Sequence, residues 1–198
     1  MRYTPVAPPN YGWLQVELNN DEMDFLWDCI GNKKLRCNNQ LAGNISNSYD
    51  LDMNDGEIFF NNALKSLCSA YEENFSTYTI NHGPTYKLKK WWVNYQKQTE
   101  FNPIHDHTGF FSFVIWMDIP TQWEDQIKNP IANDSNCGVI SNFAFQYLSI
   151  LGDLKNYEFR MNSDMNGRML FFPAKLQHQV YPFFNCDKDR ITISGNIY

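Results

Sequence analysis

The sequence predicts a mainly β fold of the α+β class, in which antiparallel strands form a sandwich or jelly roll and N-terminal helices cover one outer face. Helix-type spacing of apolar residues is confined to the first 85 residues. From residue 86 onward, short strand-like segments follow one another without an intervening helix. Helices first and strands afterwards are typical of α+β proteins. The aromatic content of 16% supports the same prediction, because aromatic side chains suit the half-buried surface of a sheet.

Size and charge narrow the class of protein. A chain of 198 residues is expected to form one domain, with residues 1–85 as an N-terminal arm and supporting helices and residues 86–198 as the jelly-roll core. The net charge of −6 disfavours nucleic acid as a partner and a polybasic membrane anchor, since both need clustered lysine and arginine. No apolar run approaches the ~18 residues of a membrane span, and no signal peptide is recognisable. The five scattered cysteines contain no C-x-x-C pair and predict reduced thiols in the cytoplasm.

The N-terminal elements are predicted from prolines, caps and helical spacing. Residues 1–11 contain three prolines and should form an extended arm, and residues 13–18 should form a short strand. Asn20 is the expected N-cap of a helix, because acidic residues occupy the following turn, and Gly31 is its expected end. Apolar residues at i, i+3, i+4, i+7, i+8 and i+11 predict a longer helix over residues 57–75 that packs on a sheet.

The second half of the chain contains the predicted strands. The β-branched and aromatic run at residues 110–119 should be a buried strand, and residues 86–97 should form another. The polar stretch at residues 121–136 is long for a hairpin connection and is interpreted as a candidate lid. Residues 42–46 are interpreted as a strand-like edge of a pocket. Further strands are expected at residues 138–150, 157–162, 168–172, 179–183 and 190–198.

Histidines mark a candidate metal site just ahead of the buried strand. Side chains at i and i+2 of an extended segment point to the same face, so the imidazoles of His105 and His107 can converge while the Asp106 carboxylate points away. Two convergent imidazoles can form half of a metal site. His178 begins a later strand after a short turn, and the sequence around it is the candidate other half. The remaining histidine, His82, precedes a Gly-Pro pair and is expected to be an exposed turn residue.

The last predicted strand carries a polar face. Arg190, Thr192, Ser194 and Asn196 recur at period two and therefore share one face of the strand. A guanidinium fork and hydroxyl groups on one face, inside a sandwich of sheets, would hold a small dicarboxylate end-on.

The motifs around these residues resemble a known family. The stretches NPIHDHTGFFSFVIWMDIP, GRMLFFPAKLQHQVYPF and DRITISGN are similar to those of the Fe(II)/2-oxoglutarate oxygenases, and more closely to the small 2-oxoglutarate–Fe(II) oxygenases encoded by T4-like marine phages. Residues 91–96 and 41–44 also fit that group. The resemblance therefore covers most of the chain, although its specific motifs lie between Trp91 and Asn196. It implies a double-stranded β-helix, which is a form of jelly roll.

The resemblance implies a metal ligand at each histidine motif. His105 and His178 take the places of the two metal-binding histidines. His107 stands where most of the superfamily has Asp or Glu, and this is a departure from the usual set of two histidines and one carboxylate. The third iron ligand is interpreted as His107, because Asp106 should point to the opposite face. Asp106 and a water molecule are the alternatives.

The resemblance also implies a site for 2-oxoglutarate. Arg190 takes the place of the residue that pairs with the C5 carboxylate of 2-oxoglutarate, and Thr192 assists through its hydroxyl group. Asn94 and Gln96 share a face of the strand before the histidines. They are therefore candidates for hydrogen bonds to 2-oxoglutarate or to the substrate.

The implied function is that of a non-haem iron(II), 2-oxoglutarate-dependent dioxygenase. Such an enzyme would use O₂, hydroxylate a prime substrate that is a protein side chain or a small molecule, and release succinate and CO₂. If the chain is phage-encoded, it would act in the cytoplasm of a bacterial host. One alternative is a three-histidine iron dioxygenase of the cupin type, in which Arg190 would have no dicarboxylate to hold. The other is a non-enzymatic jelly roll with a binding or structural role, which would bind neither iron nor 2-oxoglutarate.

Overall fold

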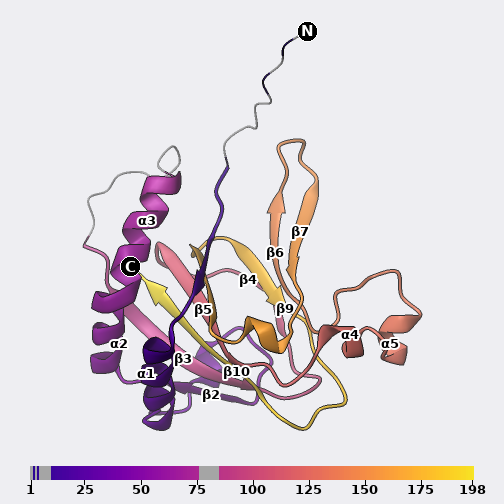
Figure 1. The fold of residues 1–198 in the computed structure, drawn as a ribbon, viewed down its shortest axis with the longest axis horizontal. Coiled ribbons are helices and arrows are strands. Elements are labelled where there is room, and N and C mark those ends of the chain that lie inside the picture. Colours follow the sequence, from indigo (N-terminus) through magenta and orange to yellow (C-terminus); the bar gives the residue numbers. More distant parts are fainter. Residues whose placement is uncertain (1, 3, 5–9, 76–84) are drawn as a thin grey trace.

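The computed structural model describes residues 2, 4, 10–75 and 85–198, and within them two antiparallel sheets face each other (Figure 1). The larger sheet has six strands in the order β1-β8-β5-β10-β3-β2, and the smaller has four in the order β4-β9-β6-β7. The strands of the larger sheet are β1 (Leu14–Glu17), β2 (Asn47–Asp50), β3 (Leu88–Gln96), β5 (Phe111–Asp118), β8 (Arg168–Pro173) and β10 (Arg190–Ile197). Those of the smaller sheet are β4 (Asn102–His105), β6 (Phe143–Leu148), β7 (Leu154–Phe159) and β9 (Gln177–Val180).

From β3 onward the chain passes back and forth between the two sheets. Strands β3, β5, β8 and β10 join the larger sheet, and β4, β6, β7 and β9 join the smaller one. This alternation is the double-stranded β-helix, so the predicted fold class is confirmed. It also pairs strands that are far apart in the sequence, including β4 with β9 and β3 with β10.

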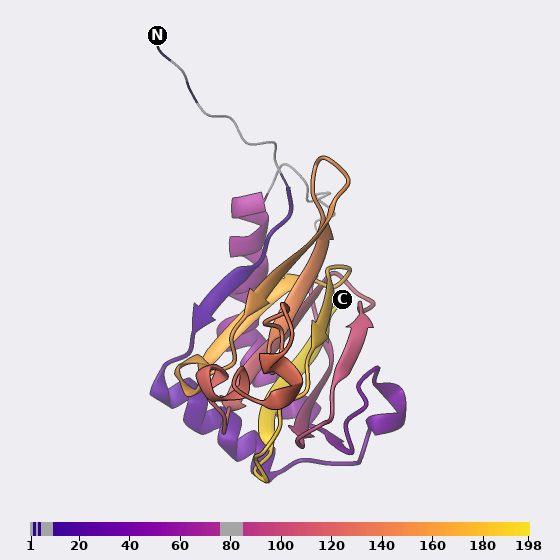
Figure 2. The same ribbon diagram turned by 90° about the vertical axis from the view of Figure 1, so that its right-hand side faces the viewer.

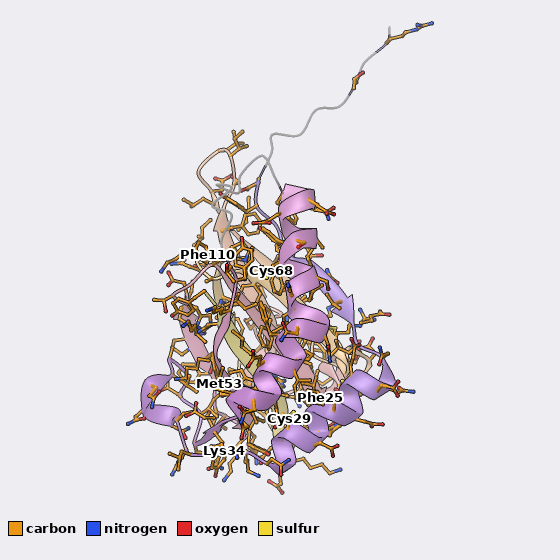
Figure 3. The ribbon with its side chains drawn as sticks, turned by 90° about the vertical axis from the view of Figure 1, so that its left-hand side faces the viewer. Phe25, Cys29, Lys34, Met53, Cys68 and Phe110 are labelled. Atoms are coloured by element: carbon orange, nitrogen blue, oxygen red, sulfur yellow. The ribbon has the colours of Figure 1, made fainter. Side chains whose placement is uncertain are left out.

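The N-terminal helices cover the outer face of the larger sheet (Figure 1). They are α1 (Asn20–Gly31), α2 (Met53–Phe59) and α3 (Lys65–Phe75), and the single π-helical turn η2 (Phe60–Leu64) joins the last two. Phe59 stacks on Trp91 of β3, with ring centroids 6.1 Å apart. Figure 3 shows this face, where Cys29 on α1 and Cys68 on α3 are buried against the sheet. All five cysteines are free thiols, as the sequence predicted.

A second hydrophobic core lies between the two sheets, and the small sheet forms the side of the molecule opposite the helices (Figure 2). Its aromatic members include Trp116 on β5, Phe145 on β6 and Phe172 on β8. This core fills only part of the space between the sheets. The rest is the polar cavity described below.

The helix boundaries differ from the prediction for local reasons. The N-cap of α1 is Asn19, not Asn20, because Asn19 and Glu22 form a reciprocal capping box with bonds of 2.8 and 2.9 Å. The helix predicted over residues 57–75 begins four residues earlier, at Met53, where the Asp52 side chain accepts a bond from the Asn54 backbone N–H. Gly56 concealed this first turn, since glycine disfavours a helix interior.

Several strands also differ from the prediction. Strand β2 was not predicted, residues 42–46 contain no strand, and the polar stretch 121–136 contains two short helices, α4 (Trp123–Gln126) and α5 (Pro130–Asn133). Strand β6 begins at Phe143, and not at residue 138, because Ser141 has a φ of +66° that no strand can accommodate. Two 3₁₀ turns, η1 (Asn38–Gln40) and η3 (Ser163–Met165), complete the elements. The prediction for His82 and part of that for residues 1–11 lie outside the described residues.

No helix in the described part of the chain has the length and apolar composition to cross a bilayer.

Gly56 on α2 lies close against Trp91 and Leu88 of β3. A Cβ atom there would lie 2.8 Å from Nε1 of the buried Trp91 indole. We expect Gly56→Ala to lower the free energy of unfolding by about 1–2 kcal/mol, because overpacking outweighs the ~1 kcal/mol gain in helix propensity. Gly31→Ala is the control, since nothing lies within 4 Å of its Cβ position. Urea unfolding measures both, and equal stability of Gly56→Ala and the wild type would contradict the tight contact.

Candidate active site

A cavity of about 740 Å³ opens between the sheets. Its floor is the inward face of β3 and β10, and its wall is formed by the end of β4, the start of β9 and residues 106–108. The loop 40–43 lies at its rim, so residues 42–46 do border a pocket although they form no strand. The side chains that the sequence singled out on these segments all line this cavity: Asn94, Gln96, His105, Asp106, His107, His178, Arg190, Thr192, Ser194 and Asn196.

Three histidines converge on one point of the cavity wall. Nitrogen atoms of His105, His107 and His178 all lie within 4.8 Å of one another. His105 ends β4 and is the register partner of His178 on β9, and their ring centroids are 4.3 Å apart. His107 follows in the loop, where its backbone N–H donates to the Ala174 carbonyl at 2.8 Å. The spacing is suited to one metal ion bound by three imidazoles.

Backbone carbonyls set the orientation of two of these rings. Nδ1 of His105 lies 2.7 Å from the Pro103 carbonyl oxygen, and Nδ1 of His178 lies 3.0 Å from that of Leu176. A carbonyl only accepts hydrogen bonds, so each Nδ1 carries the proton and each Nε2 keeps its lone pair for a metal. In the described part of the chain the His107 ring has no such partner; the Trp92 indole lies beside it, with ring centroids 6.0 Å apart.

The surroundings keep the three imidazoles neutral. Burial lowers the pKa of His105, and burial together with the neighbouring His105 lowers the pKa of His107 to about 4. Burial and the two other histidines hold the pKa of His178 well below its usual range. Neutral imidazole is the form that binds metal, so these shifts favour binding at neutral pH.

Asp106 points away from the cluster, as the alternation of side chains predicted. Its carboxylate forms an ion pair with Lys175 at 3.1 Å, and it does not belong to the group of converging ligand atoms.

Arg190 lies fully buried at the far end of the cavity, with 1% of its surface exposed. Its Nη2 donates to Ser141 Oγ at 2.6 Å, and its guanidinium stacks over the Phe183 ring. Its Nε and Nη1 are buried without a hydrogen-bond partner among the described residues, and no carboxylate pairs with it there. Burial lowers the pKa of Arg190 to about 9. A buried cation with free donors is suited to a carboxylate ligand such as that of 2-oxoglutarate.

The neighbouring polar residues are already bonded to the protein. The Asn94 amide accepts from Ser48 Oγ at 2.7 Å and donates to Thr192 Oγ1 at 3.4 Å. The Gln96 amide donates to the Glu100 carbonyl at 2.6 Å. These bonds orient Asn94, Gln96 and Thr192 across the cavity floor.

The sequence did not single out Ser141, which is fully buried. Its left-handed backbone is held by a hydrogen bond from its N–H to the Pro182 carbonyl at 3.0 Å. No motif marks this residue, since it lies 49 positions from the arginine that it contacts.

The insertion at residues 121–136, interpreted above as a candidate lid, contributes no lining residue to the cavity. It packs instead against the connection that precedes Arg190 and β10. The Gln126 amide on α4 donates to the Phe184 carbonyl and accepts from the Phe184 N–H, both at 2.8 Å. These two hydrogen bonds hold α4 against residues 183–189, the connection that leads into β10.

A jelly roll that brings a three-histidine cluster and an unpaired guanidinium into one cavity defines a metal-dependent oxygenase site. Residues 90–196, more than half of the chain, match the family described as "Putative 2OG-Fe(II) oxygenase". The chain belongs to this family, and it is an oxidoreductase that uses iron(II) and 2-oxoglutarate. Comparison with curated protein sequences gives no match.

Solved structures share the fold at low identity. A prolyl-4-hydroxylase from Pseudomonas putida is 12% identical with a TM-score of 0.53, and the match covers 93% of this chain and 91% of that one. The viral collagen prolyl hydroxylase of Paramecium bursaria Chlorella virus-1, solved with 2-oxoglutarate, is 12% identical with a TM-score of 0.52 over 93% and 94% of the two chains. A 2OG-Fe(II) oxygenase family protein from Burkholderia pseudomallei is 11% identical with a TM-score of 0.56 over 94% and 85%.

The orientation of Asp106 allows a direct test of the third ligand. We expect His107→Ala to weaken Fe(II) binding by at least about tenfold, since a lost ligand costs no less than a lost supporting partner. Asp106→Ala should change Fe(II) binding by no more than about twofold, because this carboxylate pairs with a lysine outside the cluster. Anaerobic competition with a chromogenic chelator measures both affinities. The reverse order would make Asp106 the ligand.

Proposed function

We propose that this protein is a 2-oxoglutarate-dependent dioxygenase that hydroxylates its prime substrate and releases succinate and CO₂. His105, His107 and His178 hold the iron, and Arg190 with Thr192 binds the C5 carboxylate of 2-oxoglutarate. The observation that carries the proposal is the buried, unpaired Arg190 in the same cavity as the histidine cluster. A cupin-type dioxygenase without 2-oxoglutarate would leave this charge unused.

In this reaction the residues of the chain bind and orient the metal and 2-oxoglutarate, and they exclude water from the cavity. Bound iron would supply the redox chemistry that joins O₂ to the decarboxylation of 2-oxoglutarate and the hydroxylation of the substrate. Arg190 fixes one end of the cosubstrate, and the bonded Asn94–Thr192 pair shapes the floor beside it. The apolar wall, including Trp116 and Phe143, keeps that end of the cavity dry.

Three neutral imidazoles give this site one positive charge more than two histidines and a carboxylate would. The dianion of 2-oxoglutarate offsets that charge when it binds. We therefore propose that the metal and 2-oxoglutarate bind with positive cooperativity. The negative charge of 2-oxoglutarate offsets the positive charge of the bound metal, and the metal offsets the charge of 2-oxoglutarate.

The prime substrate is a protein side chain or a small molecule. Two of the solved structures that share the fold are prolyl hydroxylases, which supports a polypeptide residue as one candidate. We also propose that residues 1–198 act as one domain and that the enzyme is of the phage-encoded type, working in the cytoplasm of a bacterial host. The sequence motifs and the five free thiols support this placement.

The proposed function is tested by anaerobic titration of the Fe(II) protein with 2-oxoglutarate, followed through the weak visible band of the chelate. We expect the band in the wild type and at least a tenfold weaker affinity in Arg190→Met. Because Arg190 has no counter-ion among the described residues, Arg190→Met should also raise the free energy of unfolding in the absence of 2-oxoglutarate. Bound iron without a band would favour the three-histidine dioxygenase, and no bound iron would favour a non-enzymatic jelly roll.

Ser141 provides a second test of the same end of the cavity. We expect Ser141→Gly to raise the dissociation constant of 2-oxoglutarate by about tenfold, because the guanidinium loses its one described hydrogen bond while the left-handed backbone is retained. Iron affinity should not change. Ser112→Ala is the control, since this buried hydroxyl contacts the Gly195 carbonyl and Asn196 Oδ1, six residues along β10 from Arg190, and not Arg190 itself. Equal 2-oxoglutarate affinity in Ser141→Gly and the wild type would show that Ser141 does not position Arg190.

A further inference from the structure

The cavity has a second charged end, which the binding of 2-oxoglutarate does not use. Lys90 and Gln96 share the inward face of β3, and they pair across the sheet with Asn196 and Arg190, respectively. Six residues of extended strand separate the two ends, a distance on the order of 20 Å. A five-carbon diacid bound to Arg190 is too short to reach Lys90.

The histidine cluster lies between these ends. Trp92 is two residues from Lys90 on the same face of β3, and its indole lies 6.0 Å from the His107 ring, centroid to centroid. The Lys90 ammonium lies over the same Trp92 ring, 5.7 Å from its centroid. Lys90 and His107 therefore both contact Trp92, and Lys90 lies toward the end of β3 that is opposite to Gln96, the register partner of Arg190.

The described contacts of the Lys90 ammonium are with neutral groups. Its Nζ donates to Gln40 Oε1 at 2.8 Å, and no ion pair to it occurs in the described part of the chain. Asp50 is the register partner of Trp92 on β2, yet its carboxylate does not come within 4.0 Å of Lys90. Asp106 lines the cavity but is paired with Lys175.

The charge of the cavity is opposite to that of the whole chain. Its charged lining consists of Lys89, Lys90 and Arg190 against the single carboxylate of Asp106, whereas the chain as a whole carries −6. A cavity lined by one sign of charge concentrates ligands of the other sign. Because 2-oxoglutarate occupies the Arg190 end, the charge at the Lys90 end is available to a different ligand.

We propose that the Lys90 end of the cavity binds an anionic group of the prime substrate, either a carboxylate or a phosphate. This proposal rests on the proposed function, and it names the class of substrate for the same site. The anionic group contacts Lys90, the body of the substrate lies along Trp92, and the carbon to be hydroxylated faces the histidine cluster. The substrate is thus an acid whose charged group and reacting carbon lie no farther apart than Lys90 and the histidine cluster, which Trp92 connects.

The experiment uses the protein loaded anaerobically with Fe(II) and 2-oxoglutarate. Isothermal calorimetry compares a series of N-acetyl amino acids with the matched N-acetyl amino acid amides, which differ only in the carboxylate. A second arm compares glycerol 3-phosphate with glycerol. In at least one arm we expect the anion to bind about tenfold more tightly than its neutral counterpart, as a charge-assisted contact requires.

Variants assign the preference to one residue. Lys90→Met keeps the aliphatic stem over Trp92 and should remove the preference for the anion, whereas Lys90→Arg should retain it. Lys97→Met is the control, because Lys97 is an exposed lysine just beyond β3 that does not line the cavity, and its preference should equal that of the wild type.

Three outcomes would overturn the proposal: no preference for the anion in either arm, a preference that persists in Lys90→Met, or a loss of 2-oxoglutarate affinity in Lys90→Met. Failure of the proposed function would look different. The visible band with 2-oxoglutarate would then be absent in the wild type, while calorimetry would still report whether an anion binds at Lys90.

Discussion

The organisation of the site depends on one buried charge that has no counter-ion among the described residues. Placing the Arg190 guanidinium between two sheets costs several kcal/mol if nothing neutralises it. The fold reduces this cost with one hydrogen bond that the guanidinium donates to Ser141 and with the face of Phe183, and two of its nitrogen atoms have no partner among the described residues. The protein therefore holds an unfavourable interaction that a carboxylate ligand relieves. If Arg190 binds 2-oxoglutarate as proposed, part of the affinity for the cosubstrate comes from this imperfect internal pairing, which selection for stability alone would eliminate.

The path of the chain explains how distant motifs meet. Apart from the β6–β7 hairpin, successive strands from β3 onward join opposite sheets, so the strand that ends at His105 and the strand that carries His178 become neighbours in the smaller sheet. The same alternation pairs β3 with β10 in the larger sheet and places Arg190 opposite Gln96. Of the three histidines, only His107 lies in a loop. The hydrogen bond from its backbone N–H to the Ala174 carbonyl connects that loop to the turn before β9. A rigid framework thus sets most of the site.

The features that the sequence predicted well are those with a short-range cause. The convergence of His105 and His107, the outward direction of Asp106 and the shared face from Arg190 to Asn196 all follow from the period of an extended strand. Ser141 and Ser48 were not predicted, because they bond residues 49 and 46 positions away. Strand β2 was missed for a related reason: its short polar sequence forms a strand only because the edge of β3 is available to pair with it. Local pattern predicted the fold class and the charged groups of the site, whereas their supporting contacts depend on tertiary structure.

Among the described residues no carboxylate belongs to the histidine cluster, and for the proposed metal site this has a consequence for metal selection. Three neutral nitrogen donors bind divalent ions in the Irving–Williams order, in which copper, nickel and zinc all exceed iron. A hard carboxylate oxygen would moderate that order, and here the nearest one is turned toward Lys175. Occupancy by iron is therefore decided by the metals that the surroundings supply during folding. Protein produced in a zinc-rich or nickel-rich medium is then expected to bind zinc or nickel in place of iron. Its specific activity will depend on the metals available during production as well as on its sequence.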